Sequence, residues 1–232
     1  MAQEFFRFPH TPHIAWLGAG QPRDDKLLSA SEARDLLSGN VVVEEKVDGA
    51  NLGFSLDAIG RLRAQNRGHY LEAPFSGQFR RLDNWLAQHA DVLVLALADD
   101  LMLFGEWCAA RHSVPYNLLP DWFVVFDVYD RTQGRFWSSA RRDALARQVG
   151  LSPAPQLASG RLTLAQVQNE LDSQPSRYRE GPMEGVVIRR ETAQWCEGRA
   201  KLVRADFTQT IDGHWRKRIP EWNRLAVPTG QA

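Results

Sequence analysis

Residues 41–51, with the sequence VVVEEKVDGAN, decide the fold of this 232-residue chain. Three β-branched valines begin a strand that runs toward an Asp-Gly pair at 48–49, where the chain turns. Residues 52–56 continue as a second strand, and a turn at 58–60 leads into a third strand over 61–66. Strand, tight turn and strand in succession are typical of an antiparallel, hairpin-rich sheet.

The remaining pattern predicts four helices, four strands and two irregular segments. Helices are expected over 31–37, 76–89, 138–149 and 163–171, with Ser31 and Thr163 as N-caps, and strands over 101–107, 123–129, 186–188 and 201–203. Residues 1–30 and 151–160 read as irregular lead-in and loop. Because no linker divides the chain, we expect one α+β domain over 1–232, with antiparallel sheets flanked by helices. Residues 206–232 form a C-terminal tail that is too short for a separate OB-fold domain.

Composition excludes several classes of protein. The chain has 28 basic and 28 acidic residues, so a blanket nucleic-acid coat is excluded, although a local basic groove is not. No apolar run approaches the ~18–20 residues that a membrane-spanning helix needs, and the N-terminus lacks the pattern of a signal peptide. Two cysteines provide no disulfide framework, so we expect a reducing, cytoplasmic setting. Neither zinc-ligand spacing nor a phosphate-binding P-loop is present.

Lysine is scarce in this chain. Lys26, Lys46, Lys201 and Lys217 are its four lysines, against 24 arginines among the 28 basic residues. An arginine cannot act as an amine nucleophile, whereas a lysine can, so Lys46 and Lys201 are candidates for chemistry. Lys46 ends the first strand, where desolvation is expected to lower its pKa. Taken alone, the segment is equally consistent with a plain hairpin, because Asp-Gly is a common turn.

Five short motifs, in order along the chain, resemble those of the covalent nucleotidyltransferases, the superfamily of ATP-dependent ligases and capping enzymes. Residues 46–51 (KVDGAN) are similar to motif I, and the others are 104–107 (FGEW), 123–129 (FVVFDVY), 184–188 (EGVVI) and 201–204 (KLVR). The residues around 105–116 and 199–207 are closest to the RNA ligase branch, in particular to phage-type RNA ligases that seal nicks in duplex RNA. The resemblance implies a nucleotidyltransferase fold, the ATP-grasp-like adenylation domain of ligases.

The resemblance also implies a role for each matching residue. Lys46 would form a covalent lysyl–AMP, and Lys201 would neutralise the α-phosphate of ATP. Nucleotide-binding residues would be Glu45, Asn51, Arg67, Glu106, Phe126 and Lys201. Glu184 and Asp48 would bind Mg²⁺ or Mn²⁺, and Arg204 and His112 would contact RNA. The family often has Lys-x-Lys in its last motif; here Arg199 with Lys201, or Lys201 followed by Arg204, leaves the second basic contact open.

The implied activity is that of an ATP-dependent RNA ligase that joins 5′-phosphate and 3′-hydroxyl ends through lysyl–AMP and RNA–adenylate. Expected partners are nicked or duplex RNA and a repair protein, with no membrane. Alternatives are a minimal DNA ligase, another adenylyltransferase, or a vestigial nucleotide- or RNA-binding module. The tail, with Trp215, Trp222 and the basic residues 216–218, either contacts RNA or packs its tryptophans on the core.

Overall fold

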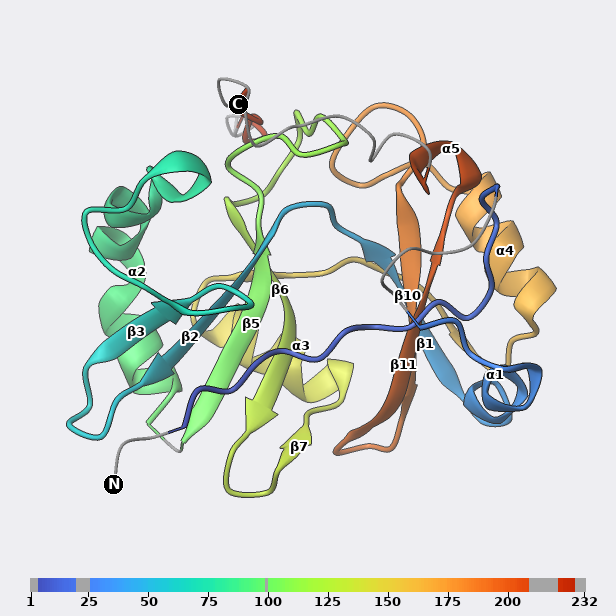
Figure 1. Ribbon diagram of the computed structural model, residues 1–232, viewed down its shortest axis with the longest axis horizontal. Coiled ribbons are helices and arrows are strands. Elements are labelled where there is room, and N and C mark those ends of the chain that lie inside the picture. The colour runs from blue at the N-terminus through green and yellow to red at the C-terminus, as the bar shows by residue number, and fades with distance from the viewer. Residues whose placement is uncertain (1–3, 20–25, 99, 209–220, 228–232) are drawn as a thin grey trace, which may run out of the picture.

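The computed structural model describes residues 4–19, 26–98, 100–208 and 221–227, and two sheets stand side by side in it (Figure 1). The first sheet has the order β11 (Cys196–Val203), β10 (Gly185–Glu191), β1 (Val41–Lys46) and β9 (Gln156–Gly160). The second has the order β4 (Tyr70–Leu71), β3 (Leu62–Gln65), β2 (Ala50–Leu56), β5 (Leu101–Trp107), β6 (Phe123–Asp130) and β7 (Arg135–Phe136), with β8 (Ser152–Pro153) paired to β6. Only the β6–β8 pairing among these strands is parallel, so the predicted antiparallel α+β fold is confirmed.

Helices flank the two sheets. They are α1 (Ala30–Leu36), α2 (Leu82–Ala96), α3 (Ser139–Gln148), α4 (Leu164–Ser173) and the short α5 (Ala205–Thr208), with a 3₁₀ turn, η1, at Gly77–Phe79. Figure 1 shows α2 outside the second sheet and α1 and α4 outside the first. None of the helices in the described ranges is long and apolar enough to cross a membrane.

Some local predictions were wrong in detail. The N-cap of α1 is Ser29 rather than Ser31, because the Ser29 hydroxyl accepts from the backbone N–H of Glu32 and completes a capping box. The single helix expected over 76–89 is η1 followed by α2, which continues to Ala96. The loop expected over 151–160 contains β8 and β9, which gain their strand conformation from pairing with β6 and β1. Thr163 caps α4 as predicted.

The Asp-Gly pair at 48–49 is not a hairpin turn, so the hairpin interpretation of residues 41–56 was wrong. Strand β1 pairs with β10 and β9, whereas β2 pairs with β3 and β5, so the chain passes from one sheet to the other between Lys46 and Ala50. A Cβ on Gly49 would lie 2.7 Å from the Trp107 carbonyl oxygen, so only glycine allows this close approach. The crossing places Lys46 where the two sheets meet.

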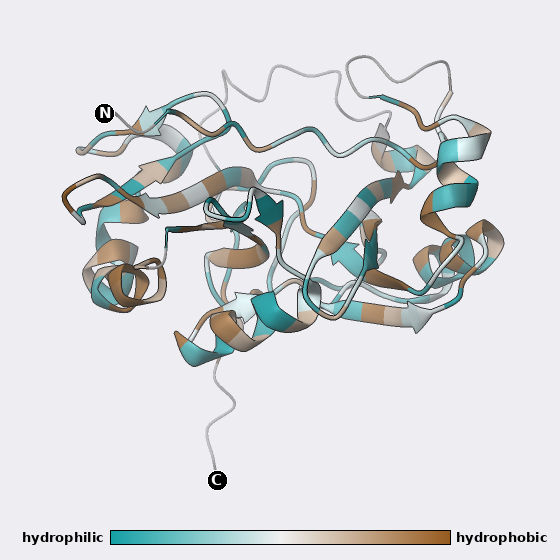
Figure 2. Cartoon of the chain, turned by 90° about the horizontal axis from the view of Figure 1, so that it is seen from below, coloured by the Kyte–Doolittle hydropathy of each residue, from teal (hydrophilic) through white to brown (hydrophobic). Residues whose placement is uncertain are grey.

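Each sheet has its own hydrophobic core. The core of the second sheet includes Leu52, Phe54 and Trp107 and packs against Trp85 and Leu93 of α2. That of the first sheet includes Val41, Val43 and Ile188, with Val167 and Leu171 of α4. Figure 2 shows hydrophobic and hydrophilic residues alternating along the strands, the pattern of strands with two different faces. The apolar faces pack against the helices, so the polar faces of the strands point into the space between the two sheets.

The two terminal segments of the described chain form hydrogen bonds with strands and loops that are remote in sequence. The irregular N-terminal segment runs across both sheets (Figure 1): the Phe6 carbonyl accepts from Gln65 in β3, and the Ile14 N–H donates to the Lys201 carbonyl in β11. Residues 221–227 of the tail lie along residues 109–119, where the Asn223 side chain donates to the Cys108 carbonyl at 2.8 Å. Trp222 packs against the core of the second sheet, as one interpretation of the tail predicted. Trp215 and the basic residues 216–218 lie outside the described residues.

An intersheet arginine cluster, Arg142, Arg189 and Arg199 with Glu44 and Asp127, joins the two sheets. The Arg142 guanidinium, on α3, is 0% exposed and binds both Glu44 oxygens, at 2.5 and 3.1 Å. Arg189, on β10, donates to Asp127 of β6 at 2.9 Å, and Arg199 of β11 pairs with the other Asp127 oxygen. Each buried charge thus has an opposite charge from a different element.

Replacing Arg142 by methionine should lower the free energy of unfolding by about 3–5 kcal/mol, because Glu44 would be left buried without its partner. Denaturant unfolding measures this. The control Arg147→Met removes a guanidinium from the same helix whose side chain is 68% exposed and should cost less than about 1 kcal/mol. The double variant Glu44→Leu/Arg142→Met should recover most of the stability lost in Arg142→Met. If Arg142→Met and Arg147→Met lowered the free energy of unfolding equally, that result would contradict a structural role for Arg142.

Candidate active site

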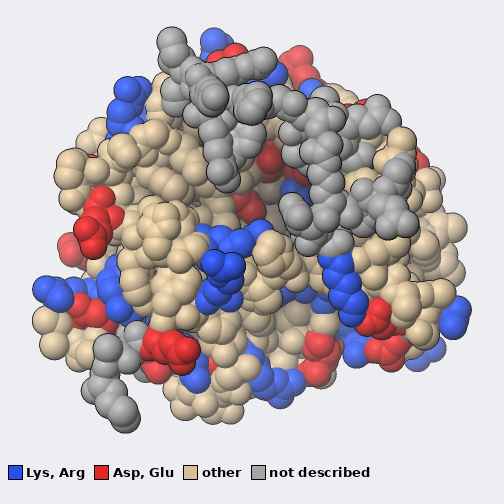
Figure 3. Space-filling view, viewed as in Figure 1, with Lys and Arg blue, Asp and Glu red and all other residues tan. Residues whose placement is uncertain are grey.

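A cavity of about 530 Å³ lies between the two sheets. Eight of the eleven predicted site residues line it, namely Glu45, Lys46, Asn51, Arg67, Glu106, His112, Phe126 and Lys201. Figure 3 shows the face of the molecule hollowed, with acidic and basic atoms together in the recess and basic side chains along its lower border. The polar faces of strands from both sheets therefore meet at one charged site.

Lys46 lines the cavity and forms an ion pair with Glu184, which does not itself line it. Its Nζ lies 2.7 Å from Glu184 Oε2, and the two side chains are 23% and 11% exposed. Burial alone would lower the pKa of Lys46, but the carboxylates of Glu184, Asp48 and Glu106 together raise it above its usual range. The expectation that desolvation lowers this pKa was therefore wrong for the protein without ligand, because carboxylates remote in sequence surround the amine.

Asn51 and Glu106 are neighbours on adjacent strands of the second sheet, paired in register between β2 and β5. Both amide atoms of Asn51 and Oε2 of Glu106 are buried and have no hydrogen-bond partner among the described residues. Burial, with smaller effects from nearby charges, raises the pKa of Glu106 to about 8. Such buried groups normally have partners, so the two residues are arranged to bind a ligand that supplies donors and acceptors.

Arg67 and Phe126 line the same cavity from opposite halves of the second sheet, near β3 and in β6 respectively. Arg67 follows β3, and its buried Nε also has no partner within the described ranges. Phe126 lies in β6, with its ring edge-on to that of Phe8 from the N-terminal segment at 5.1 Å between centroids. A ring fixed in this way offers a face for stacking on a base.

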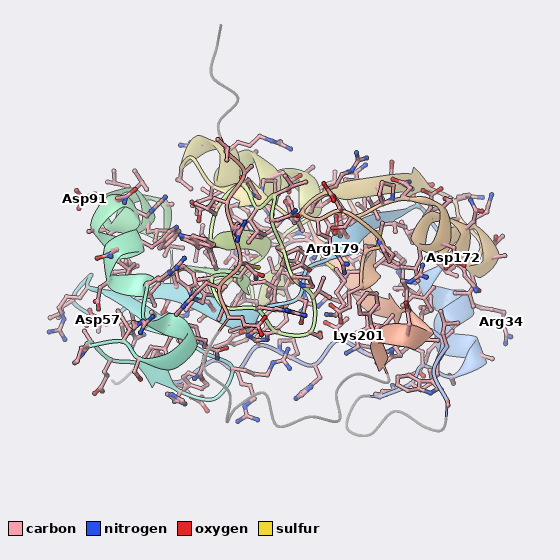
Figure 4. All side chains as sticks on the ribbon, turned by 90° about the horizontal axis from the view of Figure 1, so that it is seen from above. Arg34, Asp57, Asp91, Asp172, Arg179 and Lys201 are labelled. Atoms are coloured by element: carbon pink, nitrogen blue, oxygen red, sulfur yellow. The ribbon has the colours of Figure 1, made fainter. Side chains whose placement is uncertain are left out.

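Lys201 and Arg199 are two residues apart on β11, and both line the cavity. Figure 4 shows Lys201 toward the middle of the molecule, whereas Asp172 lies at its edge. Lys201 is register-paired with Val187 of β10. The Arg199 guanidinium lies over the rings of Phe8 and Phe136, at 4.6 and 4.0 Å. The last motif left Arg199 and Arg204 as choices for the second basic contact. Arg199 lines the cavity together with Lys201, whereas Arg204 does not.

Asp48 fixes the segment that follows β5. Its Oδ2 accepts hydrogen bonds from the Ser113 N–H and hydroxyl and from the Val114 N–H, while its own N–H donates to the Tyr116 hydroxyl. Asp48 does not line the cavity, and a metal contact would fall to its other oxygen, Oδ1. The fixed segment carries His112, whose Nε2 lies 2.8 Å from Gln78 Oε1; burial lowers the pKa of His112.

Two predicted site residues have their side chains engaged elsewhere. The Glu45 carboxylate accepts from the Ser176 hydroxyl and the Arg177 N–H, so only its backbone is left to contact a nucleotide in the cavity. Arg204 pairs with Asp172 and Asp206, outside the cavity. The Glu45 partners and Asp172 lie outside the five motifs, whereas Asp206 follows the last motif by two residues.

Sequence reasoning missed most of the charged floor of the cavity. Glu44, Asp127 and Arg189 line it, as does Phe8, and only Arg199 among the charged residues of this floor was a candidate from the sequence. Glu44 directly precedes Glu45 and Lys46 in the first motif, and Arg189 directly follows the fourth. A charged residue inside an otherwise apolar strand was the available signal, because such a residue is buried only when paired.

The site offers several unpartnered groups to ATP but few side-chain ligands to a divalent cation. The unpartnered atoms of Asn51, Glu106 and Arg67 suit a nucleotide's hydroxyls and phosphates. No group of three or more metal-ligating side chains occurs in the described part of the chain. Mg²⁺ is commonly bound by one or two carboxylates together with substrate phosphates. Glu184, with Glu106 nearby, fits that arrangement.

The fold is similar to that of known RNA ligases. A Naegleria gruberi RNA ligase with pyrophosphate superposes with a TM-score of 0.58 at 18% identity, over 76% of this chain and 52% of that one. A mutant of that ligase with ATP and manganese gives 0.58 at 13% identity, over 87% and 63%. This chain thus spans about half to three-fifths of the length of these relatives, and their likeness establishes the fold.

The RNA ligase family profile matches residues 39–203. The chain therefore belongs to the RNA ligase family. A search of curated proteins gives no significant match.

The raised pKa of Glu106 predicts how stability changes with pH in the protein without ligand. Between the unfolded value of 4.5 and the folded value of about 8, the native state holds a proton that the unfolded chain releases. The free energy of unfolding should therefore fall as pH rises through this window, by at most about 1.4 kcal/mol per pH unit from this group. Denaturant unfolding at several pH values should show a shallower fall for Glu106→Gln, and equal slopes would contradict the assignment.

Proposed function

We propose that this protein is an ATP-dependent RNA ligase that joins a 5′-phosphate to a 3′-hydroxyl through lysyl–AMP and RNA–adenylate intermediates. The observation that carries the proposal is the placement of Lys46 in the same cavity as the unpartnered polar atoms of Asn51 and Glu106. A nucleophile and unsatisfied nucleotide-binding groups are thereby brought together by elements from both sheets. The ATP and manganese complexes of structurally similar ligases support the same choice of ligands.

In the first step the Lys46 amine, once deprotonated, attacks the α-phosphorus of ATP. A nitrogen–phosphorus bond forms, the bond to the β-phosphate oxygen breaks, and pyrophosphate leaves with its electron pair. Lys201 offsets the negative charge that moves toward the leaving group, and Phe126 stacks on adenine. Glu106 accepts from a ribose hydroxyl. Positioning and charge neutralisation supply most of the rate enhancement in such displacements.

A divalent cation, Mg²⁺ or Mn²⁺, held by Glu184 with the ATP phosphates, would supply charge neutralisation and orientation of those phosphates. The other groups in the step belong to the chain. Asn51 contacts the α-phosphate, and Arg67 contacts the nucleotide and the RNA 5′-phosphate through its guanidinium. Asp48 steadies the segment that carries His112, which contacts RNA.

In the second step a 5′-phosphate oxygen of RNA attacks the same phosphorus, so the bond to Lys46 breaks and the amine regains a proton. In the third step the RNA 3′-hydroxyl attacks the activated 5′-phosphorus and AMP leaves. The expected substrate is nicked or duplex RNA, and we expect repair as the setting, in the cytoplasm and with a repair protein as partner.

Lys46→Arg tests the covalent step. Arginine keeps the positive charge opposite Glu184 but cannot act as an amine nucleophile. Intact mass after incubation with ATP and Mg²⁺ or Mn²⁺ should rise by ~329 Da for one AMP in the parent protein only. Pyrophosphate should reverse the gain.

A parallel sample with GTP separates adenylylation from capping-type chemistry. A gain with GTP alone would redirect the proposal to guanylylation. Absence of any adduct, in folded protein that does not already carry AMP, would favour a vestigial nucleotide-binding module.

The choice of RNA over DNA is tested at the 3′-hydroxyl side of a nick. Replacing the ribonucleotides that flank this end by deoxyribonucleotides should lower sealing strongly, while lysine adenylylation stays unchanged. The readout is ligated product on a denaturing gel in a single turnover with pre-adenylylated protein. Equal sealing of both nicks would support the minimal DNA ligase instead.

A further inference from the structure

Two arginines stack on two tryptophans next to the cavity. The Arg81 guanidinium carbon lies 5.0 Å from the ring centre of Trp122 and 4.3 Å from that of Trp222. Arg80 lies 5.0 Å from the same Trp222 ring. We call these four residues the Arg–Trp cluster. Neither the ATP site nor the intersheet arginine cluster uses them.

The Arg–Trp cluster is continuous with the mouth of the cavity. Gln78 and Phe79 line the cavity, and Arg80 and Arg81 follow them directly in the chain. Trp222 forms a backbone bridge with Ala110, two residues before His112, which also lines the cavity and contacts Gln78. The cluster therefore borders the cavity where η1 and the segment after β5 meet.

In the part of the chain that the structure describes, the two arginines of this cluster, Arg80 and Arg81, have no ion-pair partner. The acids beside the two tryptophans are engaged: Asp121 accepts from the Trp85 indole at 2.7 Å and from the Phe123 N–H at 2.8 Å, and Glu221 pairs with Arg111 at 2.6 Å. A second arginine–tryptophan group consists of Arg135 and Arg141 with Trp137 and Trp195. Its Arg135 is paired with Glu197, and none of its members adjoins a cavity-lining residue in the chain, whereas Arg80 directly follows Phe79.

We propose that the Arg–Trp cluster binds the phosphodiester backbone of the RNA strand that leads into the cavity. The inference rests on the proposed function and names a surface for its RNA substrate. A guanidinium held over an aromatic ring can still direct the N–H groups on its edge toward phosphate oxygens. Residues 221–227 of the tail contribute through Trp222, which holds both arginines in place.

The test is RNA affinity as a function of salt for Arg80→Ala/Arg81→Ala. Anisotropy of a short, labelled, 5′-phosphorylated RNA reports the dissociation constant of its complex with the 232-residue chain. We expect the dissociation constant to rise by about tenfold or more, since two charge-assisted contacts are lost. The slope of log affinity against log salt should become shallower by about 1.4, from ~0.7 for each single-strand phosphate contact. Adenylylation of Lys46 with ATP should proceed at the parent rate.

The matched control is Arg34→Ala/Arg161→Ala, which removes the same charge from two exposed positions on the first-sheet side. Figure 4 shows Arg34 at the outer edge of the molecule. This control should leave affinity and salt slope at the parent values. Arg81→Lys alone, which keeps the charge but loses the planar stacking group, should retain the salt slope and lose part of the affinity.

Two results would overturn the proposal: an unchanged salt slope in folded Arg80→Ala/Arg81→Ala, or an equal loss in the control. Failure of the proposed function is a separate outcome. If the parent protein forms no lysyl–AMP but its RNA affinity still depends on Arg80 and Arg81, the RNA surface stands and the ligase mechanism falls.

Discussion

The carbonyl oxygen of Phe126 accepts hydrogen bonds from two buried arginines, Arg142 at 2.8 Å and Arg189 at 3.2 Å. Arg142 is bound in turn by Glu44 of the first sheet, and Arg189 by Asp127 of the second. Separating the sheets would leave several buried charges without partners, at a cost of several kcal/mol each. These contacts therefore help to set the distance between the sheets and the width of the cavity.

The same contacts position groups that we assign to chemistry. Glu44 and Lys46 alternate with Glu45 along β1, so the first two share a face, and fixing Glu44 to Arg142 orients the strand that carries the lysine. Holding the Phe126 carbonyl fixes the backbone from which its ring extends into the cavity. Asp127 reaches Arg199 as well as Arg189, which steadies the basic residue two positions before Lys201. The structural ion network and the candidate catalytic site thus lie on neighbouring residues of the same strands.

The sequence predicted the local features of the fold better than its long-range pairing. Strands such as 101–107 follow from their own apolar pattern, and the cap of α4 follows from Thr163 with Gln166. That β1 and β2 belong to different sheets could not be foreseen, because an Asp-Gly turn is a local signal and sheet pairing is not. Likewise, motif order identified Lys46, but its raised pKa depends on Glu184, 138 residues away. The partners of Glu45 and Arg204 also became visible only with the fold.

The ion pair of Lys46 has a consequence for when the lysine can react. Among the groups that raise its pKa, Glu184 has the largest effect, so the amine keeps its proton as long as the Glu184 carboxylate faces it. Glu184 Oε2 cannot bind the ammonium group and a second cation equally well. Any cation that arrives with ATP and takes this oxygen removes the main interaction that holds the proton on Lys46 and adds a positive charge nearby; both effects lower its pKa. In the proposed mechanism, the arrangement would link deprotonation of Lys46 to the binding of ATP with its cation, because the raised pKa of Lys46 keeps the amine protonated in the protein without ligand.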